Sequence, residues 1–134
     1  DLAAARRDFA FETTMASTTF APWLRDHRGE GYTMHVILMW LQSPELAVRR
    51  VRARVRRGGH AVPEDVVRRR YARGIRNFVT LYRPLAHAWR IYDNSAAGGP
   101  RLVASAARGS GPRVYDPKVL RRIEEIADAA EGEA

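Results

Sequence analysis

The segment Tyr32–Leu41 (YTMHVILMWL) constrains the fold more than any other part of this sequence. It is almost continuously apolar, which is typical of a β-strand buried on both faces of a parallel sheet. Ser43, Pro44 and Glu45 follow and predict a helix start, because serine caps a helix, proline fits its first position and a carboxylate favours its dipole. A buried strand that leads directly into a helix favours α/β architecture.

Strands and helices are predicted to alternate along the rest of the chain. Strands are expected at 8–14, 89–93 and 101–106, and helices at 17–28, from 44, from 63 and from 117. The helix that begins at Pro63 should have one apolar face, formed by Val67, Tyr71, Ile75, Phe78, Tyr82 and Leu85. Pro84 predicts a kink, because it cannot donate a hydrogen bond to the preceding turn. The sequence therefore predicts one α/β domain with a mostly parallel sheet.

The stretch 49–77 carries eleven arginines and two acidic residues. A basic helix should end at Gly58-Gly59, a short hinge carries His60, and a second basic helix begins at Pro63. Guanidinium groups bind phosphate oxygens in a bidentate fork. Two arginine-bearing helices around a glycine hinge therefore predict a lid that grips phosphate, although a solvated basic face is the alternative.

Composition narrows the classes of partner. The formal net charge of +8 indicates an anionic partner, such as a nucleotide, a nucleic acid or an acidic lipid. The absence of cysteine excludes disulfides and thiolate metal sites, and the histidines show no metal-binding spacing, so no metal ligands are predicted. The longest apolar run, Val36–Leu41, is too short to span a bilayer, so no membrane partner and a cytoplasmic location are expected.

Three polar clusters follow predicted strands: Glu12-Thr13-Thr14, Leu41-Gln42-Ser43 and Asp93-Asn94-Ser95. Ligands of open α/β sheets bind at the carboxyl ends of the strands, so these clusters together predict a site. A helix cap explains the first cluster without function, and an ordinary turn explains the last.

Several segments together resemble the zeta-toxin-like P-loop kinases: FETT, VILMWLQSPELAVRRV, RVRRGGHAVPEDVVRRRYARGIRNF, YRPL and IYDNS. The resemblance covers 8–106, so that 1–106 would be a partial kinase domain with its lid at 49–77, and 107–134 a loop and a C-terminal helix. It implies a three-layer P-loop kinase-like fold. It also implies transfer of the γ-phosphate of ATP, with Mg²⁺, to a small hydroxylated substrate such as a UDP-N-acetylamino sugar, and an antitoxin as a protein partner.

The resemblance and the clusters give three sets of candidate site residues. The sets are Arg54, Arg57, Arg69 and Arg73 for catalysis, Glu12, Thr13 and Thr14 for the substrate, and His60, Asn94 and Ser95 for the nucleotide. The four arginines would contact the β- and γ-phosphates, because arginine stabilises charge on a transferring phosphoryl group.

The departure from the family pattern is severe, because no G-x-x-x-x-G-K-[ST] occurs in the sequence. That loop cradles phosphates with backbone N–H groups and places a lysine and a hydroxyl on the phosphates and magnesium. The chain would hold only the third to fifth strands of the family sheet. Since it also opens at Asp1 without Met, we expect part of a longer domain that is inactive alone. Two alternatives remain, a degenerate interaction module and an arginine-rich nucleic-acid-binding protein.

Overall fold

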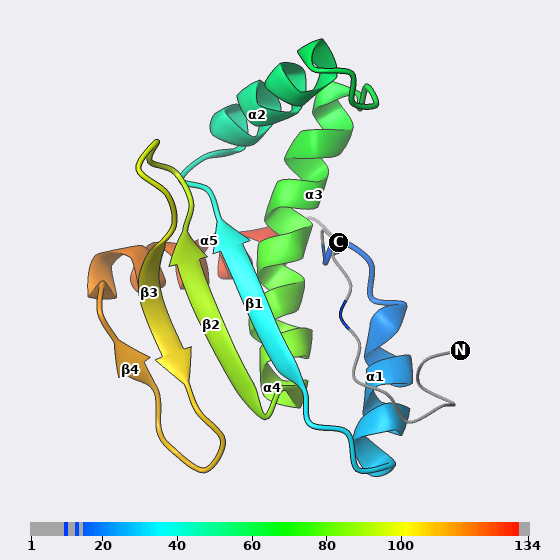
Figure 1. Cartoon of the computed structure of the whole chain (residues 1–134), viewed down its shortest axis with the longest axis vertical. Helices are drawn as coiled ribbons and strands as arrows, with labels where there is room; N and C mark the ends of the chain where they lie inside the picture. Colours follow the sequence, from blue (N-terminus) through cyan, green and yellow to red (C-terminus); the bar gives the residue numbers. More distant parts are fainter. Residues whose placement is uncertain (1–9, 11–12, 14, 132–134) are drawn as a thin grey trace.

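The structure of the chain, a computed structural model, describes residues 10, 13 and 15–131. A four-stranded sheet of order β1-β2-β3-β4 lies at its centre (Figure 1). The elements are α1 (Phe20–Gly29), β1 (His35–Trp40), α2 (Pro44–Arg56), α3 (Glu64–Asn77), the π-helix η1 (Phe78–Tyr82), α4 (Arg83–Leu85), β2 (Ala88–Asp93), β3 (Arg101–Ala106), β4 (Arg113–Val114) and α5 (Pro117–Glu131). The predicted α/β class is confirmed. The strand expected at 8–14 lies almost entirely outside the described residues.

The sheet combines parallel and antiparallel pairing, which differs from the mostly parallel sheet predicted. β1 pairs in parallel with β2, with Leu38 opposite Ile91, because the long crossover through α2 and α3 returns the chain in the same direction. Only residues 94–100 connect β2 to β3, and so short a connection permits antiparallel pairing alone. The short strand β4, which the sequence did not predict, pairs antiparallel with β3.

Helices α3 and α5 pack against one face of the sheet, and the core lies between them and the strands (Figure 1). The apolar face predicted for α3 and its continuation is confirmed, since Val67, Ile75 and Tyr82 are buried on it. The largest fully buried side chains come from four different elements and are Phe78, Ile91, Val103 and Ile123. The C-terminal helix therefore contributes to the same core as the sheet.

Local sequence signals fix the ends of α2. Ser43 Oγ accepts a hydrogen bond from the Leu46 N–H at 3.1 Å, which is the predicted cap. Gly58 ends the helix in a left-handed conformation with φ of +97°, which glycine adopts without steric cost. A Cβ atom at Gly59 would lie 3.0 Å from the Arg54 carbonyl oxygen. Both hinge glycines therefore serve the turn itself.

The kink predicted at Pro84 takes the form of the π-helix η1. Pro84 has no N–H to donate to Thr80 O, four residues earlier. The Arg83 N–H instead bonds to Phe78 O, five residues earlier, as in a π-helical turn. The helix thus widens by one residue and continues into α4 without a break.

Two side chains fasten the start of the described chain to this long helix. Asn77 is buried and its Nδ2 donates to Met15 O at 2.7 Å, while Tyr82 Oη donates to Ser17 O at 2.5 Å. Burial raises the pKa of the Tyr82 hydroxyl, which therefore remains protonated and able to donate. The bond from Asn77 gives its buried side-chain amide a partner, and an unpaired buried amide would destabilise the fold.

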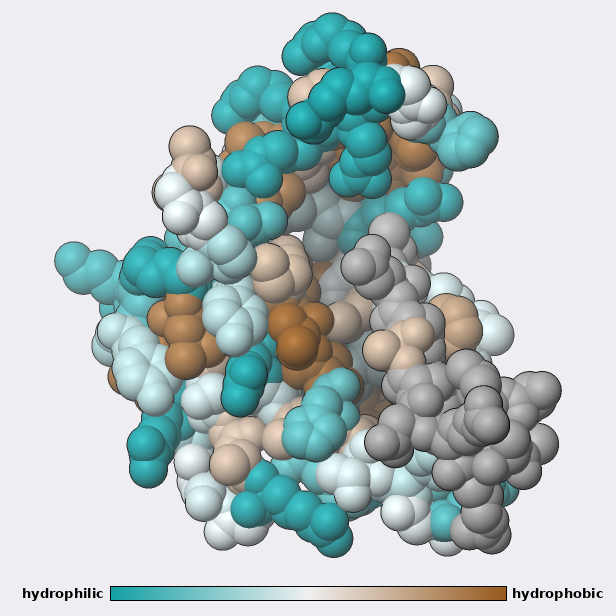
Figure 2. Space-filling view, in the orientation of Figure 1, coloured by the Kyte–Doolittle hydropathy of each residue, from teal (hydrophilic) through white to brown (hydrophobic). Residues whose placement is uncertain are grey.

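The outer face of β1 is uncovered. Ile37 is 49% exposed and Met39 is 46% exposed, and Figure 2 shows apolar side chains gathered over β1 on this face. The prediction of a strand buried on both faces is therefore wrong for the described residues, because α3 and α5 both pack on the other face. Within the described part of the chain β1 pairs only with β2, so its other edge has no strand partner.

His87 links the start of β1 to the start of β2 and should make stability depend on pH. Its Nδ1 accepts a hydrogen bond from the Met34 N–H at 2.9 Å, and Arg28 Nε lies 3.3 Å from its Nε2. Burial, followed by the charges of Arg28 and Arg108, lowers the pKa of His87. The unfolded chain then binds the proton more readily, so stability is complete above the ordinary pKa of about 6.5 and falls as pH drops through the folded-state pKa.

Urea unfolding at about pH 7.5 and about pH 5.5 tests this prediction. The free energy of unfolding should be lower at the acidic pH, and His87→Asn should lose part of that difference. His60→Asn, at the exposed hinge, is the matched control and should keep it. An identical pH dependence in wild type and His87→Asn would contradict the prediction.

Candidate functional site

The carboxyl ends of β1 and β2 form one continuous polar edge, as two of the three clusters predicted. The Asn94 N–H donates to Trp40 O at 2.8 Å. The Gln42 N–H donates to Ser95 Oγ at 2.9 Å. These bonds cross between the two strand ends, so the clusters at 41–43 and 93–95 lie against each other.

The third cluster is described only at Thr13, because Glu12 and Thr14 lie outside the described residues. Thr13 is exposed, and its Oγ1 accepts a hydrogen bond from the Met15 N–H at 3.2 Å. This bond is local and explains the position of Thr13 without a ligand. The substrate role of the three residues therefore stays a prediction.

Arg50 joins the first arginine helix to the polar edge. Its Nη2 donates to the carbonyl oxygens of Asn94 and Ser95, at 3.0 and 3.1 Å. A single guanidinium thus holds both carbonyls of the turn that follows β2. Arg50 could not be recognised from the sequence, because no periodic pattern distinguishes it from the other arginines of α2. The approach of the turn after β2 singles it out.

Replacing Arg50 by alanine should lower the free energy of unfolding by about 1 kcal/mol, since hydrogen bonds from a charged donor are lost. It should also speed amide hydrogen exchange at Gln42 and Asn94, which depend on the same turn. Arg56→Ala removes an exposed arginine from the same helix and should change neither quantity. Urea unfolding and hydrogen exchange measure both effects, and equal behaviour of the two variants would contradict the role of Arg50.

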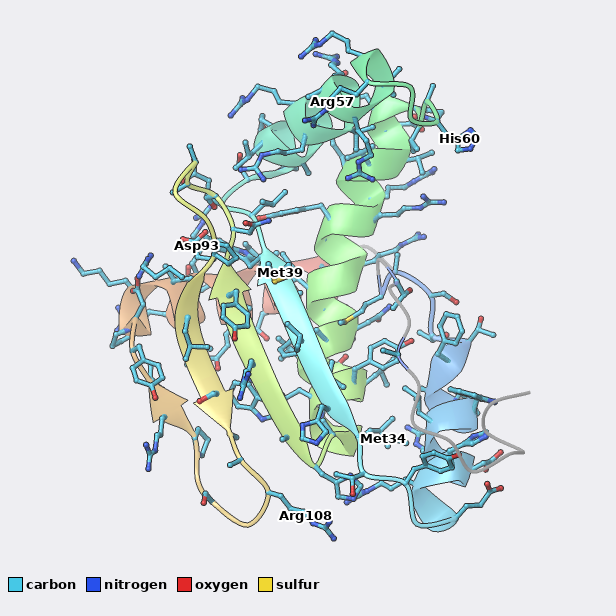
Figure 3. The ribbon with its side chains drawn as sticks, in the orientation of Figure 1. Met34, Met39, Arg57, His60, Asp93 and Arg108 are labelled. Carbon is cyan, nitrogen blue, oxygen red and sulfur yellow. The ribbon has the colours of Figure 1, made fainter. Side chains whose placement is uncertain are left out.

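The two arginine helices form a hairpin that extends beyond the carboxyl edge of the sheet (Figure 1). Figure 3 places Arg57 and His60 toward the far end of this hairpin and Asp93 at the end of β2, well separated from them. The four predicted phosphate-binding residues are all exposed on the hairpin: Arg54, Arg57, Arg69 and Arg73. The structure thus gathers these arginines on one hairpin, while His60 lies at its tip rather than beside Asn94 and Ser95.

Ion pairs between α2 and α3 set the shape of the hairpin. Arg68 on α3 contacts Glu64 at 3.0 Å and Glu45 on α2 at 3.2 Å, and Arg52 on α2 contacts Glu64 at 2.9 Å. The hydrogen bond with Glu64 raises the pKa of Arg68. A hydrogen bond from its own backbone, and then Arg68, lowers the pKa of Glu45. These side chains are exposed, so the pairs orient the two helices more than they stabilise the fold.

A second charged network lies beside the polar edge. Arg101 on β3 contacts Asp93 Oδ2 at 3.3 Å and Asp116 Oδ2 at 2.7 Å. Asp116 also accepts a hydrogen bond from the Val119 N–H and so begins α5. The Arg101 guanidinium, more than this cap, holds the pKa of Asp116 below its usual value. The network joins β2, β3 and α5, and it gives Asp93 a structural role that the sequence did not reveal.

Among the described residues no three or more His, Cys, Asp or Glu side chains come close enough to hold an ion. The strand ends at 41–43 and 93–95 lie beside the start of the arginine-rich hairpin, because α2 begins at Pro44 and its Arg50 donates to the Asn94 and Ser95 carbonyls. Such an arrangement can bind a phosphorylated ligand through charge-assisted hydrogen bonds.

Comparison with known proteins identifies relatives for much of the chain. The profile of a protein family described as "Zeta toxin" matches residues 1–97. An uncharacterized protein of Haemophilus influenzae is 29% identical over 63 residues, which are 47% of this chain and 45% of that protein. The match thus spans less than half the length of this curated relative.

No solved structure matches the chain. None of the helices that the structure describes has the length and apolarity that a membrane crossing requires. The antiparallel strands β3 and β4 and the helix α5 lie beyond the residues that the family profile matches.

Proposed function

Since this chain belongs to the zeta toxin family, we propose that it forms the lid and the carboxyl edge of an ATP-dependent kinase that acts on a small molecule. The described fold is consistent with an incomplete P-loop kinase-like fold. The observation that carries the proposal is the family match over 1–97, which includes both the arginine hairpin and the polar edge. The intact enzyme would transfer the γ-phosphate of ATP, with Mg²⁺, in the cytoplasm.

The hairpin arginines would neutralise charge on the phosphates of ATP. Arg54, Arg57, Arg69 and Arg73 are exposed, and only Arg69 contacts a carboxylate among the described residues, Asp65 at a loose 3.8 Å. Their guanidinium groups are therefore available for phosphate oxygens. Asn94 and Ser95 would border the nucleotide at the strand ends, once the hairpin carrying His60 bends toward them. Glu12, Thr13 and Thr14 would bind the substrate, for which a UDP-N-acetylamino sugar is our candidate, and an antitoxin protein would be the natural inhibitor.

A Walker A strand must complete this site, and β1 offers a place for it. The sequence has no G-x-x-x-x-G-K-[ST]. The second edge of β1 has no partner among the described strands, and the exposed Ile37 and Met39 lie on that strand. A parallel strand that pairs there would place its following loop beside Ser43 and the hairpin, because parallel strands end at the same edge.

Isothermal titration with Mg-ATP tests the proposal on two chains. One is the chain described above; the other carries a Walker A βαβ portion of about 60 residues upstream of Asp1. We expect binding by the longer chain only. Arg69→Ala with Arg73→Ala in the longer chain should weaken it by at least about tenfold, as expected for lost contacts to phosphate.

The matched control in the longer chain is Arg25→Ala, which removes an exposed arginine from α1, away from the hairpin. It should leave the affinity for Mg-ATP unchanged. Tight binding by the 134 residues alone would overturn the proposal that a Walker A strand is required. Absence of binding by the longer chain would overturn the kinase proposal itself.

Binding of nucleic acid is the second candidate, and the exposed hairpin arginines favour it. Arg49, Arg56 and Arg70 add to the exposed positive surface of the same hairpin. Phosphate contacts of this kind give an affinity that falls steeply with salt. Retention of a DNA or RNA oligonucleotide by the 134 residues, with such a salt dependence, would favour this function over the kinase.

A further inference from the structure

A hollow of about 400 Å³ lies on the helical side of the molecule, away from the hinge and from the outer face of β1. Residues of α3 and α5 form its walls, and Pro44 at the start of α2 borders it. In Figure 1, α5 runs behind the sheet and beside α3, so the hollow lies on the side of the sheet that these two helices cover. Its volume lies within the range of about 300–1,000 Å³ that small-molecule sites occupy.

The floor of the hollow is apolar and open because its side chains are small. Ala72 from α3 and Ala129 and Ala130 from α5 leave room that larger side chains would fill, and Ile126 supplies further apolar surface. The ring of Tyr71 also lines it, while its hydroxyl donates to Leu41 O at 2.7 Å. Burial raises the pKa of Tyr71 to about 12, so the phenol stays neutral and adds no negative charge.

Three arginines border this apolar floor. Arg68 is held by two carboxylates, Glu64 and Glu45, whereas Arg69 contacts, among the residues that the structure describes, only the Asp65 carboxylate at 3.8 Å. Arg122 is exposed and makes no hydrogen bond or ion pair with any residue that the structure describes. The hollow therefore combines an apolar floor with the weakly paired guanidinium of Arg69 and that of Arg122.

We propose that this hollow binds a soluble amphiphilic phosphate, with its phosphate on Arg122 and Arg69 and its apolar part on Ile126 and the alanines. A guanidinium fork matches phosphate oxygens, and the volume accommodates a short chain or ring behind the head group. Arg68 borders the site but keeps its two carboxylate partners. One wall of the hollow belongs to α5, which lies outside the residues that the family profile matches, so the proposal does not rest on the ATP site, although Arg69 is common to both.

Isothermal titration with hexyl phosphate tests the site in the full chain. Hexyl phosphate should bind more tightly than inorganic phosphate or hexanol, because each of those offers only one half of the ligand. Arg122→Ala should weaken binding at least tenfold. Arg121→Ala removes the neighbouring exposed arginine of α5, which does not line the hollow, and should leave the affinity within twofold of wild type.

A second variant tests the apolar half without changing the charge. Ala129 is exposed on α5, so Ala129→Leu should fold normally, as judged by its thermal unfolding, yet fill the hollow and weaken binding at least tenfold. Ala97→Leu, in the exposed turn after β2, is its control and should bind like wild type.

Three results would overturn the proposal. Equal losses in Arg121→Ala and Arg122→Ala would reveal a diffuse basic surface. Equal affinity for inorganic phosphate and hexyl phosphate would show that the apolar floor does not contribute to binding. Binding to vesicles that contain phosphatidic acid, without binding to hexyl phosphate, would assign the arginines to a lipid surface instead.

Discussion

Replacing Phe78 by alanine should lower the free energy of unfolding by about 3–5 kcal/mol, which is typical of a large buried aromatic side chain. Phe78 is fully buried at the start of η1. Its ring packs edge-to-face against Trp89 with centroids 6.4 Å apart, and the Arg83 guanidinium lies 6.0 Å from its centroid. The substitution would leave a cavity where the long helix meets the sheet, and a domain of this size has little stability to spare.

Urea unfolding followed by circular dichroism measures this loss. Phe20→Ala is the matched control, because Phe20 is 37% exposed at the start of α1. Phe20→Ala should lower the free energy of unfolding by well under half as much as Phe78→Ala, since folding withdraws less of the Phe20 side chain from water. Equal losses in the two variants would show that η1 is not the centre of the core.

Ile123→Ala should lower the free energy of unfolding by about 2–5 kcal/mol, the cost of removing a fully buried aliphatic side chain. Ile123 lies on α5 and is 0% exposed, within the same core as Ile75 and Ile91. The prediction matters because α5 lies beyond the residues matched by the family profile. A large loss would establish that this helix is integral to the fold.

Val114→Ala on β4 provides the control for Ile123→Ala, since Val114 is 44% exposed. This substitution should lower the free energy of unfolding by less than about 1 kcal/mol. The same unfolding experiment serves both variants. A loss at Ile123 no greater than that at Val114 would mean that α5 associates only loosely with α3. The hollow proposed between these helices would then lack a rigid wall.

Much of the fold was accessible from the sequence because short-range chemistry decides it. Ser43 and Pro44 predicted the start of α2, and the cap is present. The apolar spacing from Val67 to Tyr82 predicted which face of α3 is buried, since a helical repeat commits every third or fourth residue to one side. The polar ends of β1 and β2 met as predicted, because the carboxyl ends of neighbouring parallel strands share an edge.

Contacts between distant segments could not be predicted in the same way. The hairpin arginines are alike in sequence, yet it is Arg50 whose guanidinium donates to the carbonyls of Asn94 and Ser95. Arg101 bridges Asp93 and Asp116 through side chains that no spacing rule connects. The apolar sequence of β1 predicted burial on both faces, yet one face is exposed. Burial depends on which elements pack against a strand as well as on its composition.

The sequence by itself determined the local structure of this protein: the caps and hinge glycines, the buried face of α3, the strand β1 and the excess of arginine at 49–77. The caps, the hinge glycines and the buried face of α3 follow from backbone conformation or side-chain periodicity within a few residues. Only the tertiary structure decided which face of β1 is covered, which arginine reaches the strand ends, and that α3 and α5 enclose an arginine-lined hollow. These outcomes depend on packing between segments far apart in the chain. A local sequence pattern carries no information about which of those segments come into contact.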